Sequence, residues 1–233
     1  MVRANPLDRM NDYLESLKFY LSVPEHLIDR ILFIDNSASD ISPLAELAAR
    51  IQHDKIVEII SFEGNDHPPA YGKTYGEFKL IDFGLANTTL LKEQDIFWKV
   101  TGRLRFRNIG EMIAALPPAY DVACDLHNLP LVGTGRLIGN RYMDLRAFSC
   151  TVRAYNLLFR KTYESLTWRF DWRFLYRVVD DARYKLNVIP RFPIQPELEG
   201  ISGRHNRAYD SGIQGTKGRL RTVLRRFAPW LWI

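Results

Sequence analysis

Hydrophobic and polar positions along the chain divide it into alternating helical and extended stretches. Over residues 8–22 the apolar side chains recur at intervals of three and four, which predicts an amphipathic helix. Residues 30–35 form a short continuous apolar run with a polar end, as expected for a buried parallel strand. Ser42 followed by Pro43 predicts a helix that begins there and continues to about residue 52.

The same alternation continues through the next part of the chain. The pattern predicts further strands at 55–62, 95–100 and 120–126, and helices at 75–91 and 109–116. Strands that alternate with helices favour a mostly parallel, Rossmann-like sheet with helices on both faces. The predicted fold class is therefore α/β.

The pattern changes after residue 146. Residues 151–166 and 171–183 have the spacing of helices, and a final helix is predicted from about residue 216 to 228. The stretch between them, 189–215, has little periodicity and is interrupted by prolines and glycines. A loop of that length in a compact domain is typical of a functional lid or a binding loop.

Length and composition indicate how these elements are organised. A chain of 233 residues with 46% hydrophobic residues fits one or at most two globular domains and excludes disordered and collagen-like classes. We predict one domain over residues 1–215 and a helical extension over 216–233. The first thirty residues carry no apolar run of secretory or membrane-spanning length. Two cysteines, Cys124 and Cys150, fit a reducing cytosol better than a disulfide-stapled secreted fold.

The charge is unevenly distributed along the chain. The formal net charge is +5, but the 33 residues from Ile201 onward hold seven Lys and Arg against one Asp, which gives +6. The remaining residues hold 25 Lys and Arg against 26 Asp and Glu, which gives −1. A positive excess confined to one end predicts an anionic surface as a partner of that end.

The predicted C-terminal helix has the pattern of an interfacial membrane anchor. One face collects apolar residues such as Val223 and Phe227, and a Trp-containing segment follows the helix. Cations that meet anionic head groups and indoles that lie at the membrane boundary are what such an anchor needs. The predicted membrane-contacting residues are Arg219, Arg221, Arg225, Arg226, Trp230 and Trp232. The alternatives are a helix packed on its own domain and, less favoured because no recognised module is present, a nucleic-acid-binding tail.

Polar side chains follow each predicted strand, where ligands bind in open α/β sheets. The four clusters are Asp35-Asn36-Ser37, Gly64-Asn65-Asp66-His67, Lys99-Val-Thr-Gly-Arg103 and Asp125-Leu-His127-Asn128. Turns use the same residue types, so any one cluster can also be an ordinary turn.

Two of these clusters carry specific chemistry. Lys99 and Arg103 are two cations that could hold a diphosphate or a carboxylate from one side. Asp125 and His127 lie two residues apart, so in a strand both side chains would face one divalent cation or the ribose and phosphate of a nucleotide. A zinc site is not indicated, because no other His or Cys lies at ligand spacing.

Further carboxylates follow the fourth predicted strand. Asp144, with Arg146 two residues later, and Asp171 could each act as a general base on a hydroxyl or stabilise an oxocarbenium-like cation. Asp171, Asp180 and Asp181 could equally lie on a solvated helix face.

Several of these strings together resemble one enzyme family. The strings are Arg9-Met-Asn-Asp-Tyr-Leu-Glu-Ser-Leu17, Ile31-Leu-Phe-Ile-Asp-Asn-Ser37, Tyr71-Gly-Lys-Thr-Tyr-Gly-Glu77, Phe97-Trp-Lys-Val-Thr-Gly-Arg103 with Asn108, Arg141-Tyr-Met-Asp-Leu-Arg-Ala-Phe148 and Glu199-Gly-Ile-Ser-Gly203. In this order and spacing, over about residues 5–210, they resemble bacterial glycosyltransferases of the GT-A type. That family builds cell-surface polysaccharide such as lipopolysaccharide O antigen or capsule.

The resemblance implies a GT-A-like catalytic domain that binds a nucleotide-sugar donor (UDP-sugar or similar) at the strand ends. It places Asp35, Asn36 and Ser37 near the nucleobase or ribose. It also implies that Lys73 and Glu77 open the helix beside the donor, with Lys99, Arg103 and Asp125 near the phosphates or the sugar. Asp144, Asp171 and Arg146 are the expected catalytic residues.

The resemblance also implies a cofactor, a partner and a location. Such enzymes usually hold Mn²⁺ or Mg²⁺ with an Asp-x-Asp, whereas this chain has Asp125-Leu-His127. They also usually begin with a strand, whereas a helix is predicted first in this chain. The expected function is transfer of a sugar to a lipid-linked glycan acceptor, by a cytoplasmic enzyme that is peripheral on the inner face of the cytoplasmic membrane, with no nucleic-acid partner. The alternative is a non-catalytic nucleotide-sugar-binding or membrane scaffold protein of the same fold.

Overall fold

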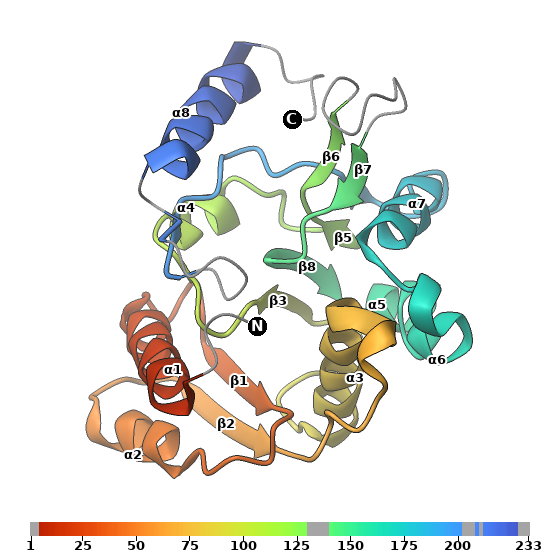
Figure 1. Cartoon of the computed structure of the whole chain (residues 1–233). Coiled ribbons are helices and arrows are strands. Elements are labelled where there is room, and N and C mark those ends of the chain that lie inside the picture. Colours follow the sequence, from red (N-terminus) through yellow and green to blue (C-terminus); the bar gives the residue numbers. More distant parts are fainter. Residues whose placement is uncertain (1–4, 130–139, 202–207, 210–211, 228–233) are drawn as a thin grey trace.

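The structure is a computed structural model that describes residues 5–129, 140–201, 208–209 and 212–227 (Figure 1). Trp230 and Trp232, two of the predicted membrane-contacting residues, lie outside the described residues. The described part is a mixed α/β fold with several small sheets, and helices lie around the central strands in Figure 1.

The secondary structure alternates between helices and strands through the first half. The helices are α1 (Pro6–Ser22), α2 (Ser42–Arg50), α3 (Gly72–Asn87), α4 (Ile109–Ala114), α5 (Val152–Leu158), α6 (Thr162–Leu166), α7 (Trp172–Ala182) and α8 (Gly212–Phe227). The strands are β1 (Arg30–Asp35), β2 (Ile56–Ser61), β3 (Ile96–Val100), β4 (Arg105–Phe106), β5 (Val122–Ala123), β6 (Leu126–Leu129), β7 (Asn140–Met143), β8 (Ala147–Thr151), β9 (Val188–Ile189) and β10 (Leu198–Glu199).

The largest described sheet has four strands in the order β3-β8-β5-β9. Strand β8 is antiparallel to both β3 and β5, whereas β5 and β9 are parallel. Strands β1 and β2 form a separate parallel pair. The α/β class is thus confirmed, but the sheets are small and mixed, and the mostly parallel sheet that the sequence predicts is not clearly formed.

The four-stranded sheet separates two hydrophobic cores because successive side chains of a strand point to opposite faces. Phe97 of β3 and Phe148 of β8 belong to one core, which α3, α5 and α7 cover. The neighbouring residues Trp98 and Ala147 belong to the other core, which is closed by side chains of α1 and α4. Helices therefore cover both faces of this sheet, as predicted.

The β1–β2 pair is enclosed in the same way. Its core contains Leu17 of α1 and Leu44 of α2, packed against Phe33 of β1. On the other face α3 comes so close that a Cβ added at Gly84 would lie 2.0 Å from the Ile34 side chain. A glycine at this position of α3 therefore permits the close packing of the helix on β1.

Two side-chain contacts connect β1 to the segments that flank β3. Arg30, at the start of β1, donates a hydrogen bond to Asp95, immediately before β3, at 3.2 Å. At the other end, the position of a Cβ on Gly102, just after β3, would lie 3.6 Å from the Phe33 ring. The start of β1 is therefore linked to the start of β3, and Phe33 of β1 lies near the residues that follow β3.

The predicted element bounds agree closely with the structure in the first half of the chain and less well after it. The predicted strand 30–35 matches β1, and the predicted helix 8–22 lies within α1. The predicted strand 120–126 is divided into β5 and β6, which pair with different strands: β5 with β8 and β9, and β6 with β7. Strand β8 was not predicted, although it pairs with both β3 and β5.

Candidate functional site

The topology brings four chain segments to one edge of the four-stranded sheet. Strands β3, β5 and β9 end there, and β8 begins there because it runs in the opposite direction to β3. The Thr101 amide donates a hydrogen bond to the Arg146 carbonyl at 2.9 Å, and the Leu126 amide donates one to the Pro190 carbonyl at 2.8 Å. Residues that are far apart in the sequence, at 101–103, 125–127, 144–146 and 190–192, therefore meet at this edge.

Asp144 and Arg146 form a short-range ion pair at the start of β8. The Arg146 guanidinium donates from Nε to both carboxylate oxygens at 2.9 Å, and from Nη2 to Oδ2. Burial by itself would raise the pKa of Asp144, but the charge and hydrogen bonds of Arg146 outweigh it and hold that pKa well below its ordinary value. Asp144 is therefore a fixed negative charge at any physiological pH.

His127 lies in β6 beside two carboxylates and is almost fully buried, with 2% of its surface exposed. Its Nε2 lies 3.9 Å from Oδ2 of Asp125 and 4.0 Å from Oδ2 of Asp144, too far for direct hydrogen bonds. The ring stacks on Tyr142 of the paired strand β7, with centroids 4.6 Å apart. Within the described residues, neither ring nitrogen has a hydrogen-bond partner.

The protonation of His127 follows from this setting. Burial lowers its pKa below the ordinary value, and the nearby charges of Asp125 and Asp144 oppose that shift without cancelling it. His127 is therefore a neutral imidazole near pH 7, with one lone pair available as a proton acceptor. A buried polar side chain with no partner is rare in proteins and marks a place where a ligand or a water belongs.

Asp125 is bound by an arginine from the C-terminal helix α8. The Arg225 guanidinium donates hydrogen bonds to Oδ2 of Asp125, to the Phe192 carbonyl and, at 2.8 Å, to the Gln195 side-chain oxygen. Arg225 is 9% exposed. The prediction that Arg225 contacts a membrane is thus wrong: its side chain points into the protein, because Asp125 and two carbonyl oxygens supply better partners than solvent.

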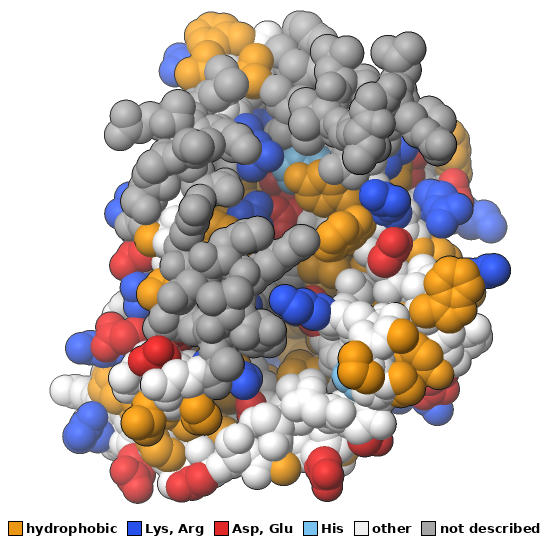
Figure 2. All heavy atoms as spheres, in the orientation of Figure 1, with side chains coloured by type: hydrophobic (Ala, Val, Ile, Leu, Met, Phe, Trp, Pro, Cys, Tyr) orange, Lys and Arg blue, Asp and Glu red, His pale blue; other side chains and the backbone are white. Residues whose placement is uncertain are grey.

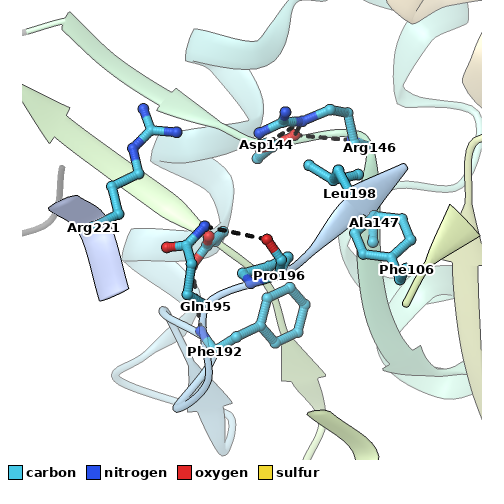
Figure 3. A pocket seen from close by; sticks show the side chains of 10 residues that line it. Phe106, Asp144, Arg146, Ala147, Phe192, Gln195, Pro196, Leu198 and Arg221 are labelled. Carbon is cyan, nitrogen blue, oxygen red and sulfur yellow. Dashed lines mark hydrogen bonds and ion pairs between the residues drawn. The ribbon is translucent and has the colours of Figure 1, made fainter. Parts of the chain in front are cut away.

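A pocket lies between α8 and this edge of the sheet (Figure 3). Asp125, Asp144 and Arg146 line it together with Gln195 and Arg221, and apolar side chains including Phe106, Phe192 and Leu198 complete it. In Figure 3, Arg221 reaches into view from α8, across the pocket from the Asp144–Arg146 pair, and no hydrogen bond or ion pair joins it to the other residues drawn. Nearby, burial and then the charges of Arg225 and Arg221 lower the pKa of Arg191 to about 10.

Lys99, expected to contact phosphate, and Glu77, expected to lie beside the donor, are bound to each other. The Lys99 ammonium forms an ion pair with Glu77 of α3 and donates a second hydrogen bond to the Leu145 carbonyl. Only 9% of the Lys99 side chain is exposed. The pair therefore links α3 to the Asp144–Arg146 turn, and Lys99 presents no uncompensated charge at the site.

The end of β1 forms a second group of polar side chains. Asp35 is 6% exposed and accepts hydrogen bonds from the Ser37 amide at 2.8 Å and from its hydroxyl at 2.6 Å. Arg9 of α1 donates a hydrogen bond to Tyr13 at 3.1 Å. That bond, and to a lesser extent the charge of Asp35, raises the pKa of Arg9. Only the string of residues 9–17 in the family resemblance hinted at Arg9, which the predicted site did not include.

The remaining predicted donor residues have different settings. The backbone carbonyl of Asn36 accepts a hydrogen bond from the Gly64 amide at 3.0 Å. Lys73 is exposed in the first turn of α3. Arg103 follows β3, and its buried Nε has no hydrogen-bond partner within the described part of the chain. Arg103 is therefore the predicted phosphate-contacting residue with an open donor at this edge.

Asp171 has a structural role at the start of α7. Its carboxylate accepts hydrogen bonds from the Arg173 and Phe174 amides, each at 2.9 Å, which is the arrangement of a helix N-cap. Figure 2 shows basic side chains near α7 at the right of the view, where Arg173 and Arg177 are exposed. Both bonds end on Oδ1, so the contacts favour a structural role for Asp171 over the predicted catalytic one, which stays a prediction.

Three kinds of comparison with known proteins were made, and none found a match: no family model, no curated protein and no solved structure matches this chain. The function proposed below is therefore inferred from the contacts of the site.

The residues at this site do not fit the divalent cation that the resemblance implies. Asp125 is hydrogen-bonded to Arg225, and both oxygens of Asp144 are bonded to Arg146, so neither carboxylate offers an unoccupied oxygen pair. No group of three His, Cys, Asp or Glu in the described residues could hold a metal ion. The roles of these side chains are therefore considered without a metal ion.

Helix α8 has an outer face as well as the inner one that carries Arg225. Val223 is 52% exposed and Phe227 is 71% exposed, and Arg226 is exposed beside them with its guanidinium over the Phe227 ring. The side chain of Arg219, another predicted membrane contact, lies outside what the structure describes. Among the described residues, no helix has the length and apolar character needed to cross a membrane.

Proposed function

We propose that this protein is a glycosyltransferase with a GT-A-like domain. It moves a sugar from a nucleotide-diphosphate donor to a lipid-linked glycan acceptor, in the synthesis of a bacterial surface polysaccharide such as O antigen or capsule. The observation that carries this proposal is His127, a buried neutral imidazole with no hydrogen-bond partner in the described structure, held between Asp125 and Asp144 at the strand-end edge. Ligands bind at this edge in open α/β sheets.

The chemistry of sugar transfer matches these groups. The bond between the anomeric carbon and the donor phosphate oxygen breaks while the acceptor oxygen bonds to that carbon, and the nucleoside diphosphate leaves. His127 takes the proton of the acceptor hydroxyl, because a neutral imidazole is a base suited to neutral pH. Asp144, kept ionised by Arg146, stabilises the positive charge that develops on the sugar ring. Arg146 acts as a positioning residue for Asp144.

The donor is proposed to lie between the end of β1 and this group. Asp35, Asn36 and Ser37 face the nucleobase or ribose, and the open donor of Arg103 faces the phosphates. Support comes from the short distance between Gly102, after β3, and the Phe33 ring of β1, and from the hydrogen bond between Thr101 and Arg146. Lys73, exposed at the start of α3, is the further cation on the donor side.

The proposed acceptor is linked to a lipid, so the proposed enzyme acts at a membrane. We place the protein on the inner face of the cytoplasmic membrane as a peripheral protein, held through the outer face of α8. Val223 and Phe227 are large exposed apolar side chains next to Arg226, and this combination suits the boundary of an anionic bilayer. Arg225 takes no part in that contact, since it is bonded to Asp125.

Turnover and binding together test the enzymatic proposal. Calorimetric titration of the full chain with UDP and UDP-sugars should give binding, and a lipid-linked glycan acceptor should support transfer. In His127→Gln we expect sugar transfer to fall by about a hundredfold or more while UDP binding is kept, since general base catalysis contributes about 10²–10⁴. Asp171→Asn, at the N-cap of α7, is the matched control and should keep its activity.

Two outcomes would contradict the proposal. A wild-type chain that binds neither nucleotide sugars nor nucleoside diphosphates would refute it outright. Binding with no detectable transfer, and no difference between wild type and His127→Gln, would favour the non-catalytic scaffold instead. Circular dichroism of each variant shows that the comparison is made between folded proteins.

Vesicle sedimentation tests the membrane contact. We expect the full chain to sediment with phosphatidylglycerol vesicles and not with phosphatidylcholine vesicles, and Phe227→Glu to reduce sedimentation several-fold. This substitution is better than deletion of the tail, because deletion would also remove the buried Arg225. Leu157→Glu on α5, at a side chain that is 68% exposed, is the control. Equal sedimentation of Phe227→Glu and wild type would overturn the membrane contact.

A further inference from the structure

Positive charge exceeds negative charge around the pocket between α8 and the strand-end edge when Arg225, which is bonded to the lining residue Asp125, is counted with the lining residues. Asp125 is paired with Arg225, and Asp144 is paired with Arg146, so each carboxylate already has a guanidinium. Arg221 is an additional cation that lines the same pocket and is bonded to none of the other lining residues (Figure 3). The pocket is therefore electrostatically suited to an anion that has not yet been assigned to it.

The geometry of α8 explains why the Arg221 side chain faces the pocket. Arg221 and Arg225 are four residues apart, so their side chains lie on the same face of α8. Arg225 is anchored by its three hydrogen bonds to Asp125, Phe192 and Gln195, which fixes the rotation of the helix. With that rotation Arg221 must face the pocket, while Arg226 is left on the exposed outer face.

Other groups around the pocket favour an anion with several oxygens. The Gln195 side chain can donate from its amide nitrogen, which in this structure donates only a long 3.4 Å hydrogen bond, to the Pro196 carbonyl. Arg191 is close enough for the charges of Arg225 and Arg221 to act on it. The apolar side chains of Phe106, Phe192 and Leu198 exclude water from one wall, which strengthens charge-assisted hydrogen bonds.

We propose that Arg221, with Gln195, forms a subsite for a phosphate or diphosphate group beside this small pocket of about 10 Å³, and that α8 completes the substrate site in this way. A guanidinium binds two phosphate oxygens at once, which makes arginine suitable for this task. The diphosphate could belong to the donor or to a lipid-linked acceptor, and this assignment of the source rests on the proposed function. The anion subsite itself does not.

The first experiment is a calorimetric titration of the full chain with inorganic pyrophosphate in the presence of EDTA. Wild type should bind, and Arg221→Gln should raise the dissociation constant about tenfold, which corresponds to about 1.4 kcal/mol. Arg226→Gln removes the same charge from the same helix on its exposed face, so its dissociation constant should stay within about twofold of wild type. Arg221 has no bond to the other lining residues, so its loss should leave the fold intact, which circular dichroism verifies.

Three results would overturn the subsite. They are no pyrophosphate binding by the wild type, equal weakening in Arg221→Gln and Arg226→Gln, and no weakening in either. The second result would show only a general electrostatic attraction to the basic tail. Binding that appears only after Mn²⁺ is added is a case of the first result, because the proposed binding uses protein side chains and no metal.

The second experiment distinguishes the source of the diphosphate. UDP is titrated into wild type and Arg221→Gln under the same conditions. A loss of UDP affinity that equals the loss of pyrophosphate affinity supports the subsite and assigns it to the donor. Unchanged UDP affinity, with weakened pyrophosphate binding, supports the subsite and assigns it to the acceptor. If wild type binds pyrophosphate but no nucleotide, the proposed function fails and the anion subsite stands.

Discussion

Replacement of Arg225 by methionine tests how α8 is attached to the rest of the protein. Methionine keeps the length and the apolar stem of the side chain and removes the guanidinium. The substitution deletes three hydrogen bonds, to Asp125, the Phe192 carbonyl and Gln195. Among the described residues, it leaves the Asp125 carboxylate, which is 4% exposed, with a single hydrogen bond from the Phe192 amide at 3.3 Å.

The expected loss is large because a buried charge remains without its partner. Removal of one member of a buried ion pair costs about 3–5 kcal/mol in the free energy of unfolding. For a chain of this size, each kcal/mol lowers the melting temperature by about 2–4 °C, so Arg225→Met should melt about 10 °C below wild type. A second change, Asp125→Asn, removes the orphaned charge, and the double variant should regain about half of the lost stability.

Urea denaturation followed by circular dichroism measures these differences. Arg226→Met, one residue away and exposed, is the matched control and should change the free energy of unfolding by less than about 0.5 kcal/mol. Equal stabilities of Arg225→Met and Arg226→Met would refute the reasoning, since α8 would then not be docked through Arg225. A double variant less stable than Arg225→Met would show that the Asp125 charge is not what makes the loss large.

Three further predictions concern the frame of the site. Asp171→Ala should lower the free energy of unfolding by about 1 kcal/mol through loss of the N-cap, measured by urea denaturation, and should leave UDP binding unchanged. Gly84→Ala should cost about 1–3 kcal/mol in the same assay, because its Cβ would overlap the Ile34 side chain, and an unchanged stability would contradict that packing. The free energy of unfolding should fall as the pH drops below about 6.5, because burial lowers the pKa of His127 in the folded state and the unfolded chain binds the proton first. His127→Phe should flatten that pH dependence, and an identical slope in the variant would refute it.

The sequence predicts the elements whose signals are local. Strand β1 is predicted at its observed bounds because a continuous apolar run ends at Asp35, and α1 and α7 follow from the spacing of apolar residues three and four apart. Strand β8 was missed because its residues, 147–151, lie next to a helical pattern and four of the five are buried, so they show no alternation of apolar and polar positions. Its partners, β3 and β5, are far away in the sequence, so no local pattern announces the pairing.

The candidate site shows the same division. The sequence singled out Asp125 with His127 and Asp144 with Arg146, because polar residues that follow an apolar run are visible in one dimension. It did not show that His127 lies within a strand of its own, β6. The sequence does not show that His127 of β6 lies close to Asp144, which follows β7. This proximity depends on the register of the β6–β7 hairpin, which pairs His127 with Tyr142 and Leu126 with Met143.

The arginines of α8 show most clearly which features depend on the tertiary structure. By itself, the sequence determined that 216–233 would be basic and that part of it would be an amphipathic helix. It could not separate Arg225 from Arg226, since the two are identical neighbours on a helix that could turn either side inward. Only the tertiary structure decided that Arg225 is buried against Asp125 and that Arg226 faces outward, because a buried carboxylate selects the guanidinium whose position on the helix brings it within hydrogen-bond distance.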